Sequence, residues 1–255
     1  MVVDWALQAS EKHFSAVINL DGSGEIKSFK LPFTTNRPVQ SVVMASSEIG
    51  KRVETWERMD ENMVVAGTFD GSVILVQLKA TEIGVDGRLQ QRFQKHPTPV
   101  TTICGNERTV ITGAADGFVR VFSVSAPQPS LNELDNEPLR VLIGHKPGVH
   151  LNQVSLGSRD GTLLSGNTDV SVRLWNYATG ECIRTFRFDC MAGLVAVLGC
   201  NRNQIAVKWD DAATAITYIG VYRLSNGEIL TRLQASTIGR FYASDLYEQY
   251  MLCGT

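Results

Sequence analysis

The sequence has no excess of charge of either sign, no long hydrophobic run and no paired-cysteine motif, and each absence excludes a class of protein. Of its 255 residues, 24 are Lys or Arg and 26 are Asp or Glu, so a net charge of −2 offers no global field to a nucleic-acid backbone or an anionic membrane. The longest uncharged apolar stretch, residues 192–200, is about half as long as a membrane-spanning helix. The N-terminus places Asp4 where a leader would be basic and then apolar, so no signal peptide is expected.

The cysteines form no recognisable framework. Their number is odd and no two have the Cys-x-x-Cys spacing, which argues against a disulfide scaffold and predicts small buried hydrophobic residues in a reducing compartment. We therefore expect a location in the cytoplasm, the nucleus or both. The five residues are Cys104, Cys182, Cys190, Cys200 and Cys253.

What the sequence does contain is an internal repeat. The segments 64–76 (VVAGTFDGSVILV), 110–122 (VITGAADGFVRVF) and 163–175 (LLSGNTDVSVRLW) align without gaps. In each, a short apolar strand ends in a small residue and Gly, a tight turn carries Asp, and an alternating strand follows. The turn residues Asp70, Asp116 and Asp169 lie 46 and 53 residues apart. The period of two and the lack of convincing helical windows predict an all-β protein built of hairpins.

Further strands around these hairpins complete units of four strands and roughly 40–50 residues, the pattern of a propeller blade. Over residues 139–186, Gly144-His145 and the run VRLWNYATGECIRTF resemble the WD-repeat β-propeller family, with Asn176 in place of the usual Asp. The resemblance implies four-stranded antiparallel blades in a single domain over residues 1–255. In the second blade, we expect the inner strand at residues 39–44 and the next strand at residues 63–67.

About five and a half blades can be assigned along the sequence. The final residues 252–255 (LCGT) align with residues 65–68 (VAGT), so the sequence ends two residues before the expected turn Asp. We therefore expect a domain that is incomplete at its C-terminus, with an unpaired strand edge. The alternative is a closed six-bladed ring with a divergent last blade.

The resemblance also implies a structural tetrad, and only the fourth blade has all four members: His145, Ser165, Asp169 and Trp175. Ser, His and Asp could also form a hydrolase triad, but that reading requires an exposed nucleophile elbow. Ser165 instead lies within a strand, in LLSGN, so a structural role is favoured.

The third blade has a partial tetrad of His96, Thr112 and Asp116, with Phe122 where Trp is expected. No metal site and no cofactor are expected, because His145 and His150, the closest pair of histidines, have no Cys or carboxylate at ligand spacing. Scattered basic residues give no nucleic-acid groove.

Three long excursions would fall on one face of the second and third blades: residues 46–62, 79–86 and 125–137. Long loops in a compact domain are often functional. Trp56 and Met59 lie among charged residues in the first excursion and are candidate anchors for a protein partner. The competing interpretation places Trp56 in a longer strand.

Together these features predict a non-catalytic scaffold or adaptor that binds other proteins within a multiprotein complex, without membrane contact and without nucleic acid. The alternatives are a substrate receptor of a ubiquitin ligase complex, for which no F-box-like helical segment is present, and a propeller enzyme.

Overall fold

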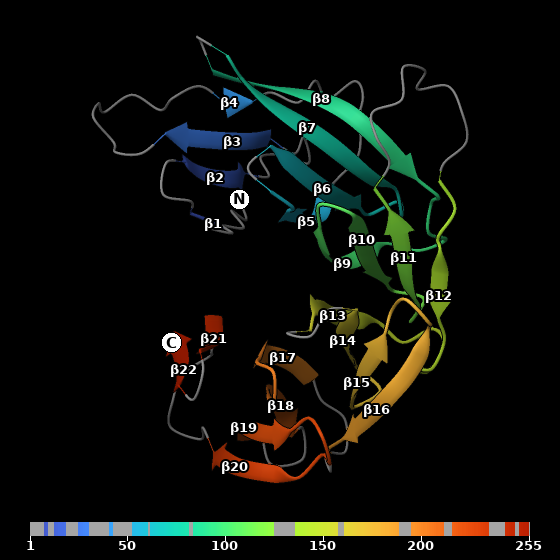
Figure 1. The fold of residues 1–255 in the computed structure, drawn as a ribbon, viewed down its shortest axis with the longest axis vertical. Helices are drawn as coiled ribbons and strands as arrows, with labels where there is room; N and C mark the ends of the chain where they lie inside the picture. The colour runs from blue at the N-terminus through green and yellow to red at the C-terminus, as the bar shows by residue number, and fades with distance from the viewer. Residues whose placement is uncertain are drawn as a thin grey trace. The chain divides into compact units, whose positions relative to one another are not determined.

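The structure is a computed structural model. It describes residues 8–9, 13–18, 25–30, 41–42, 53–60, 62–81, 84–124, 136–157, 161–188, 195–211, 216–234, 243–247 and 250–254. Within these ranges the chain forms 22 β-strands (Figure 1). No helix long and apolar enough to cross a membrane occurs in this described part.

Five sheets have four strands each, and strands that follow one another in the chain are neighbours in the sheet. We name these sheets blades one to five. Blade one contains β1 (Gln8–Ala9), β2 (His13–Ile18), β3 (Glu25–Lys30) and β4 (Ser41–Val42). Blade two contains β5 (Val53–Arg58), β6 (Met63–Thr68), β7 (Val73–Thr81) and β8 (Gly84–Phe93). Blade three contains β9 (Val100–Asn106), β10 (Thr109–Ala114), β11 (Val119–Ser123) and β12 (Arg140–Leu142).

The remaining strands continue the same order. Blade four contains β13 (Leu151–Leu156), β14 (Thr162–Asn167), β15 (Ser171–Asn176) and β16 (Glu181–Arg187). Blade five contains β17 (Val195–Cys200), β18 (Gln204–Asp211), β19 (Ile216–Arg223) and β20 (Ile229–Gln234). A sheet of two strands follows, with β21 (Ala243–Tyr247) antiparallel to β22 (Tyr250–Gly254).

The predicted all-β fold of four-stranded antiparallel blades is confirmed. Every strand pair in blades one, two, four and five is antiparallel. Five such sheets and a two-stranded sheet correspond to the five and a half blades expected from the sequence.

The chain divides into two compact units, which are described separately. The first unit comprises Met1–Val110 and Phe122–Pro138, and the second comprises Ile111–Val121 and Leu139–Thr255. The prediction of one domain over residues 1–255 stays a prediction.

Burial falls from the middle strands of a blade to its outer strand. In β14, every residue after Thr162 is buried, whereas Phe186 is the one buried residue of β16 and β20 is mostly exposed. This gradient is expected where middle strands have both faces covered and outer strands have one edge open. One core cluster of the second unit joins blades four and five, and it includes Leu164, Val172, Phe186, Val195 and Trp209.

The tight turns between the second and third strands are linked to the segments that lead into the next blade. In the first unit, His96 donates its backbone N–H to the carbonyl of Gly71 at 2.9 Å. In the second unit, Gly148 donates to Asp116 at 2.8 Å, and Phe188 donates to Val170 at 3.3 Å. These turns therefore join neighbouring blades as well as neighbouring strands.

Two of the predicted excursions are wrong. Residues 53–58, within the first excursion, form β5, the first strand of blade two. The expected inner strand at residues 39–44 is also wrong, because Ser41–Val42 is β4 and pairs with β3 in blade one. The charged residues of VETWER obscure the strand pattern in the sequence, although Val53 and Trp56 pack against the core.

The second predicted excursion, residues 79–86, is the end of a long hairpin in which Lys79, Ala80 and Thr81 pair with Asp86, Val85 and Gly84. Most of the third, residues 125–135, lies outside the described residues.

Candidate functional site

The structure brings His145, Ser165, Asp169 and Trp175 together in blade four. The Nδ1 atom of His145 lies 3.2 Å from Oδ2 of Asp169, and its Nε2 atom lies 2.7 Å from Oγ of Ser165. Trp175 donates its indole N–H to the same Oγ atom at 2.8 Å. Three of the four side chains are almost inaccessible to water, since His145, Ser165 and Trp175 are 3%, 0% and 1% exposed.

A single direction of hydrogen bonds satisfies all four side chains. Trp175 can only donate, so Oγ of Ser165 accepts from it and its own hydroxyl is available to donate. Neutral His145 accepts that hydroxyl proton at Nε2 and donates its Nδ1 proton to Asp169. Each donor in this chain of four therefore meets an acceptor.

Ser171 is a fifth member of this network, and the sequence patterns did not predict it. Oγ of Ser171 lies 2.6 Å from Oδ1 of Asp169, and the backbone N–H of Ser171 donates to the same oxygen at 3.1 Å. The feature of the sequence that could have indicated Ser171 is the Asp-x-Ser spacing in TDVS, residues 168–171. In blade two, Ser72 likewise donates its backbone N–H to the carboxylate of Asp70. Such a bond from residue i+2 is an ordinary Asx turn.

The environment of Asp169 keeps its carboxyl group ionised. Burial alone would raise the pKa of Asp169, but the hydrogen bonds from His145, Ser171 and the backbone N–H of Lys146 hold that pKa well below its usual range. Asp169 thus accepts hydrogen bonds from four donor groups that belong to His145, Lys146 and Ser171.

Strand positions set this geometry. Ser165 is in the middle of β14, and Trp175 is near the end of β15, where it pairs with Leu163. The turn between the two strands contains Val170, a non-glycine residue with a φ of 63°. The corresponding turns in blades two and three have Gly71 and Gly117 at φ values of 90° and 86°.

A substrate cannot reach the side chain of Ser165, so this arrangement does not suit a hydrolase triad. Catalysis by serine needs Oγ at an exposed site with room for a reacting carbonyl. Here Oγ of Ser165 is enclosed and already bonded to His145 and Trp175. The atoms of the triad are therefore occupied in holding β14, β15 and the preceding Gly-His loop together.

The partial tetrad of the third blade is buried as well. In the first unit, His96 is 1% exposed and its ring makes an edge contact with Phe122, with centroids 6.3 Å apart. In the second unit, Thr112 is 0% exposed, and Asp116 forms an ion pair with Arg120 at 2.9 Å.

Trp56 and Met59 do not project from a loop. Trp56 lies in β5 and packs, partly buried, against the core cluster of Val64, Ala66 and their neighbours. Met59 packs against a second cluster in the same unit, and its backbone N–H donates to the carbonyl of Met63. Neither interpretation of Trp56 holds as stated, because Trp56 lies in a separate first strand of blade two, β5, and not in a loop or in an extension of β6.

Among the described residues, no group of three or more His, Cys, Asp or Glu side chains is arranged to hold a metal ion. Cys104, Cys182 and Cys200 are free thiols.

Comparisons with known proteins agree with this architecture. Residues 87–123 match the family model "WD domain, G-beta repeat", and this segment holds His96, Thr112, Asp116 and Phe122. Among solved structures, the chain is similar to the computationally designed Ika8 protein, with a TM-score of 0.69 and 19% identity. That match covers 97% of this chain and 66% of the designed chain, so the chain spans slightly less than two thirds of that protein's length. WD-repeat proteins are generally scaffolds that bind other proteins. Residues 87–123 thus carry a WD repeat of the G-beta type within a fold of four-stranded blades, and the resemblance to the WD-repeat family that the sequence indicated is confirmed.

Proposed function

We propose that this protein is a non-catalytic scaffold or adaptor that holds other proteins in a multiprotein complex. The observation that carries the proposal is the WD-type repeat at residues 87–123 within a fold of repeated blades. Repeated blades offer many loops and outer edges, which suit the binding of proteins better than the chemistry of one small site.

The state of the tetrad supports the same proposal. Its Ser, His and Asp atoms satisfy one another and Trp175, so this cluster contributes to stability. We place the scaffold in the cytoplasm, the nucleus or both. Three free cysteines in the described part of the chain are consistent with a reducing compartment.

The test begins with capture of proteins from a cell extract on the folded chain and, in parallel, on heat-unfolded chain. Captured proteins are then made recombinantly, and their binding to the chain is measured by isothermal titration calorimetry. We expect at least one saturable interaction that the unfolded chain does not make. Identical captured sets on folded and unfolded chain would overturn the proposal. The identity of the bound proteins distinguishes an adaptor from a substrate receptor of a ubiquitin ligase complex.

The enzyme alternative has its own measurement. Hydrolysis of an activated ester is compared between the wild type and Ser165→Ala. We expect equal, background rates. A wild-type turnover that is abolished in a Ser165→Ala variant of unchanged secondary structure would establish a hydrolase and refute the scaffold proposal.

A further inference from the structure

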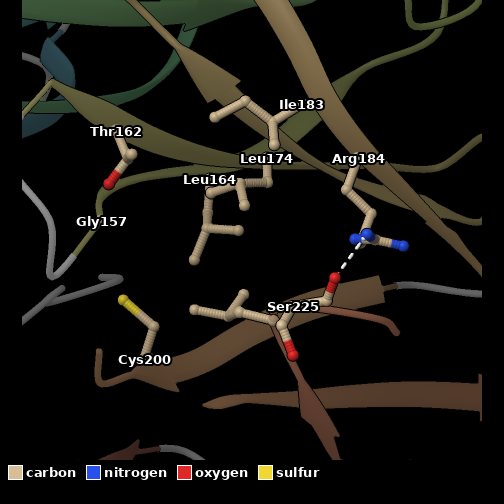
Figure 2. Close-up of a pocket in the computed structure, with 9 residues that line it drawn as sticks. Gly157, Thr162, Leu164, Leu174, Ile183, Arg184, Cys200 and Ser225 are labelled. Atoms are coloured by element: carbon tan, nitrogen blue, oxygen red, sulfur yellow. Dashed lines mark hydrogen bonds between the residues drawn. The ribbon is translucent and has the colours of Figure 1, made fainter. Parts of the chain in front are cut away.

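A cavity of about 230 Å³ lies within the second unit, between blades four and five. Figure 2 shows Leu164, Leu174 and Ile183 from blade four on one side, and Cys200 and Ser225 on the opposite side. Its volume is below the roughly 300–1,000 Å³ typical of sites for whole cofactors or drug-sized ligands. The space is suited to one or two side chains of a bound peptide.

The wall from blade four combines an apolar surface with a cation. Leu164 and Leu174 are buried, whereas Ile183 is 47% exposed and lies at the rim. Arg184 follows immediately in the chain and also lines the cavity. Both neighbours reach the cavity because β16 has a bulge here: Leu174 pairs with Arg184 and Trp175 with Cys182, which leaves Ile183 as the extra residue.

The side chain of Arg184 makes one hydrogen bond among the described residues. Its Nη2 atom donates to the backbone carbonyl of Ser225 at 2.6 Å (Figure 2). Its Nε atom is buried and has no hydrogen-bond partner among the described residues. A half-buried guanidinium with a spare donor is an unfavourable arrangement unless an acceptor, best an anion, completes it.

A comparison with blade two shows that the fold does not require a positive charge at the position of Arg184. Blade two has the same bulge in β8, where Leu75 pairs with Gln91 and Val76 with Leu89. In that blade, the residue after the bulge is Gln91, which donates its side-chain amide to the backbone carbonyl of Ser123 at 3.0 Å. A neutral amide therefore suffices for this kind of link, and Arg184 adds a positive charge and a second donor.

From these observations we propose that the cavity binds a segment of a partner protein in which a branched apolar side chain stands beside a carboxylate. The apolar side chain fills the space between Leu164, Leu174 and Ile183, and the carboxylate pairs with the guanidinium of Arg184. This inference rests on the proposed scaffold function and specifies the chemistry of one partner.

Binding is tested with peptides that differ at one position. The probes are acetylated, amidated hexapeptides Gly-Ser-Leu-Glu-Ser-Gly, Gly-Ser-Leu-Gln-Ser-Gly and Gly-Ser-Ser-Glu-Ser-Gly, and hexanoate serves as a small carboxylate. Methyl signals of Ile183, Leu164 and Leu174 are followed by NMR on the whole chain. We expect the Leu-Glu peptide to shift these signals at concentrations about tenfold lower than either of the other peptides, since a hydrogen bond to a charged group is lost with Gln and the apolar anchor with Ser.

The decisive variant is Arg184→Gln, which removes the charge and retains an amide of the kind that Gln91 uses. We expect it to lose the preference for Glu over Gln, with the Leu-Glu peptide bound about tenfold more weakly. Arg187→Gln is the matched control, because it removes an exposed positive charge from the same strand outside the cavity. It should leave binding unchanged. If Arg184→Gln lowers the melting temperature, Arg184→Lys replaces it and should keep the preference for Glu.

Several results would overturn the inference: no shift of the cavity methyls by the Leu-Glu peptide, an unchanged preference in Arg184→Gln, or hexanoate binding more tightly than the peptide, which would indicate a small carboxylic acid as the ligand. Capture from extract on wild-type and Arg184→Gln chains separates this outcome from failure of the scaffold. Equal captured sets without peptide binding reject the cavity and leave the scaffold standing, whereas no captured protein on either chain rejects both.

Discussion

Replacing Asp169 by Ala should destabilise blade four through the donors that it leaves behind. Asp169 accepts from Nδ1 of His145, from the hydroxyl and backbone N–H of Ser171, and from the backbone N–H of Lys146. Lys146 is exposed and can turn to water, but His145 and Ser171 are 3% and 4% exposed. The variant therefore buries two side chains that have lost their common acceptor, and only the contact of 3.3 Å between Oγ of Ser171 and Nδ1 of His145 remains to them.

The magnitude follows from the number of stranded groups. Each buried donor that loses its partner costs about 1–3 kcal/mol. Two such side chains predict a loss of about 3 kcal/mol, after allowing for water that can enter where the Asp169 side chain is 12% exposed. In a domain of this size, each kcal/mol lowers the melting temperature by about 2–4 °C, so we expect a decrease of about 6–12 °C.

Circular dichroism melting measures the total effect, and hydrogen exchange by mass spectrometry shows whether it is centred on β14 and β15. Asp210→Ala is the control, because Asp210 also lies in the second unit and its side chain is 41% exposed. That variant should melt within about 2 °C of the wild type. An Asp169→Ala chain that also melts within 2 °C, with unchanged exchange in β14 and β15, would refute the stabilising role of the network.

Three further predictions concern the same turns and their acid dependence. The pKa of Asp169 is lower in the folded than in the unfolded chain, so the ionised carboxylate contributes its full stability above the unfolded pKa of about 3.9 and loses it as the pH falls towards the folded pKa. The free energies of unfolding of wild type and Asp169→Asn, measured in urea, should therefore differ by a constant amount from pH 7 to 5 and converge in strong acid. Gly71→Ala should destabilise the first unit by about 2–4 kcal/mol in denaturant titration, because φ is 90° and a Cβ atom would lie 2.2 Å from the carbonyl oxygen of His96; a loss below about 1 kcal/mol would contradict this. Val170→Gly should be more stable than Val170→Ala by about 1 kcal/mol in denaturant titration, because both variants remove the side chain that packs against the core cluster and only Gly adopts a φ of 63° without strain; equal stabilities of the two variants would argue against strain.

Local patterns made the central hairpins predictable from the sequence. Segments such as 163–175 combine alternating polarity with a turn that carries Asp, and both features depend on neighbouring residues alone. The tetrad members could also be placed, because the resemblance assigns each to a position in a repeat. Ser171 could not be found in that way, since its role follows from the Asx turn at Asp169.

Strand β5 shows why blade two was misplaced. The sequence Val-Val-Met at residues 42–44 is more apolar than VETWER, so the pattern favoured the wrong segment. In the structure, only one side of β5 packs on the core, through Val53 and Trp56, while Glu54 is exposed. A charged first strand is stable here because β6 pairs along its length, a long-range contact that no local pattern reports.

The repeats serve as internal controls for one another, and their differences identify the positions where this chain departs from what a blade needs. Gly71 and Gly117 show that the turn works best without a side chain, so Val170 marks strain beside the complete tetrad. Gln91 shows that the residue after the outer-strand bulge can be neutral, so the charge of Arg184 is not explained by the link to the next blade. At some positions one blade has a residue that costs stability or leaves a buried donor unsatisfied, while the equivalent residue of another blade does neither. The shared fold of the blades does not explain such a residue, so it requires another reason. Val170 has a reason within the fold, because its side chain packs against the core cluster of blades four and five. The link that Arg184 makes gives no reason for its charge, whereas the adjoining apolar cavity supplies one, and this contrast is why the cavity, and not the tetrad, is where we look for a partner.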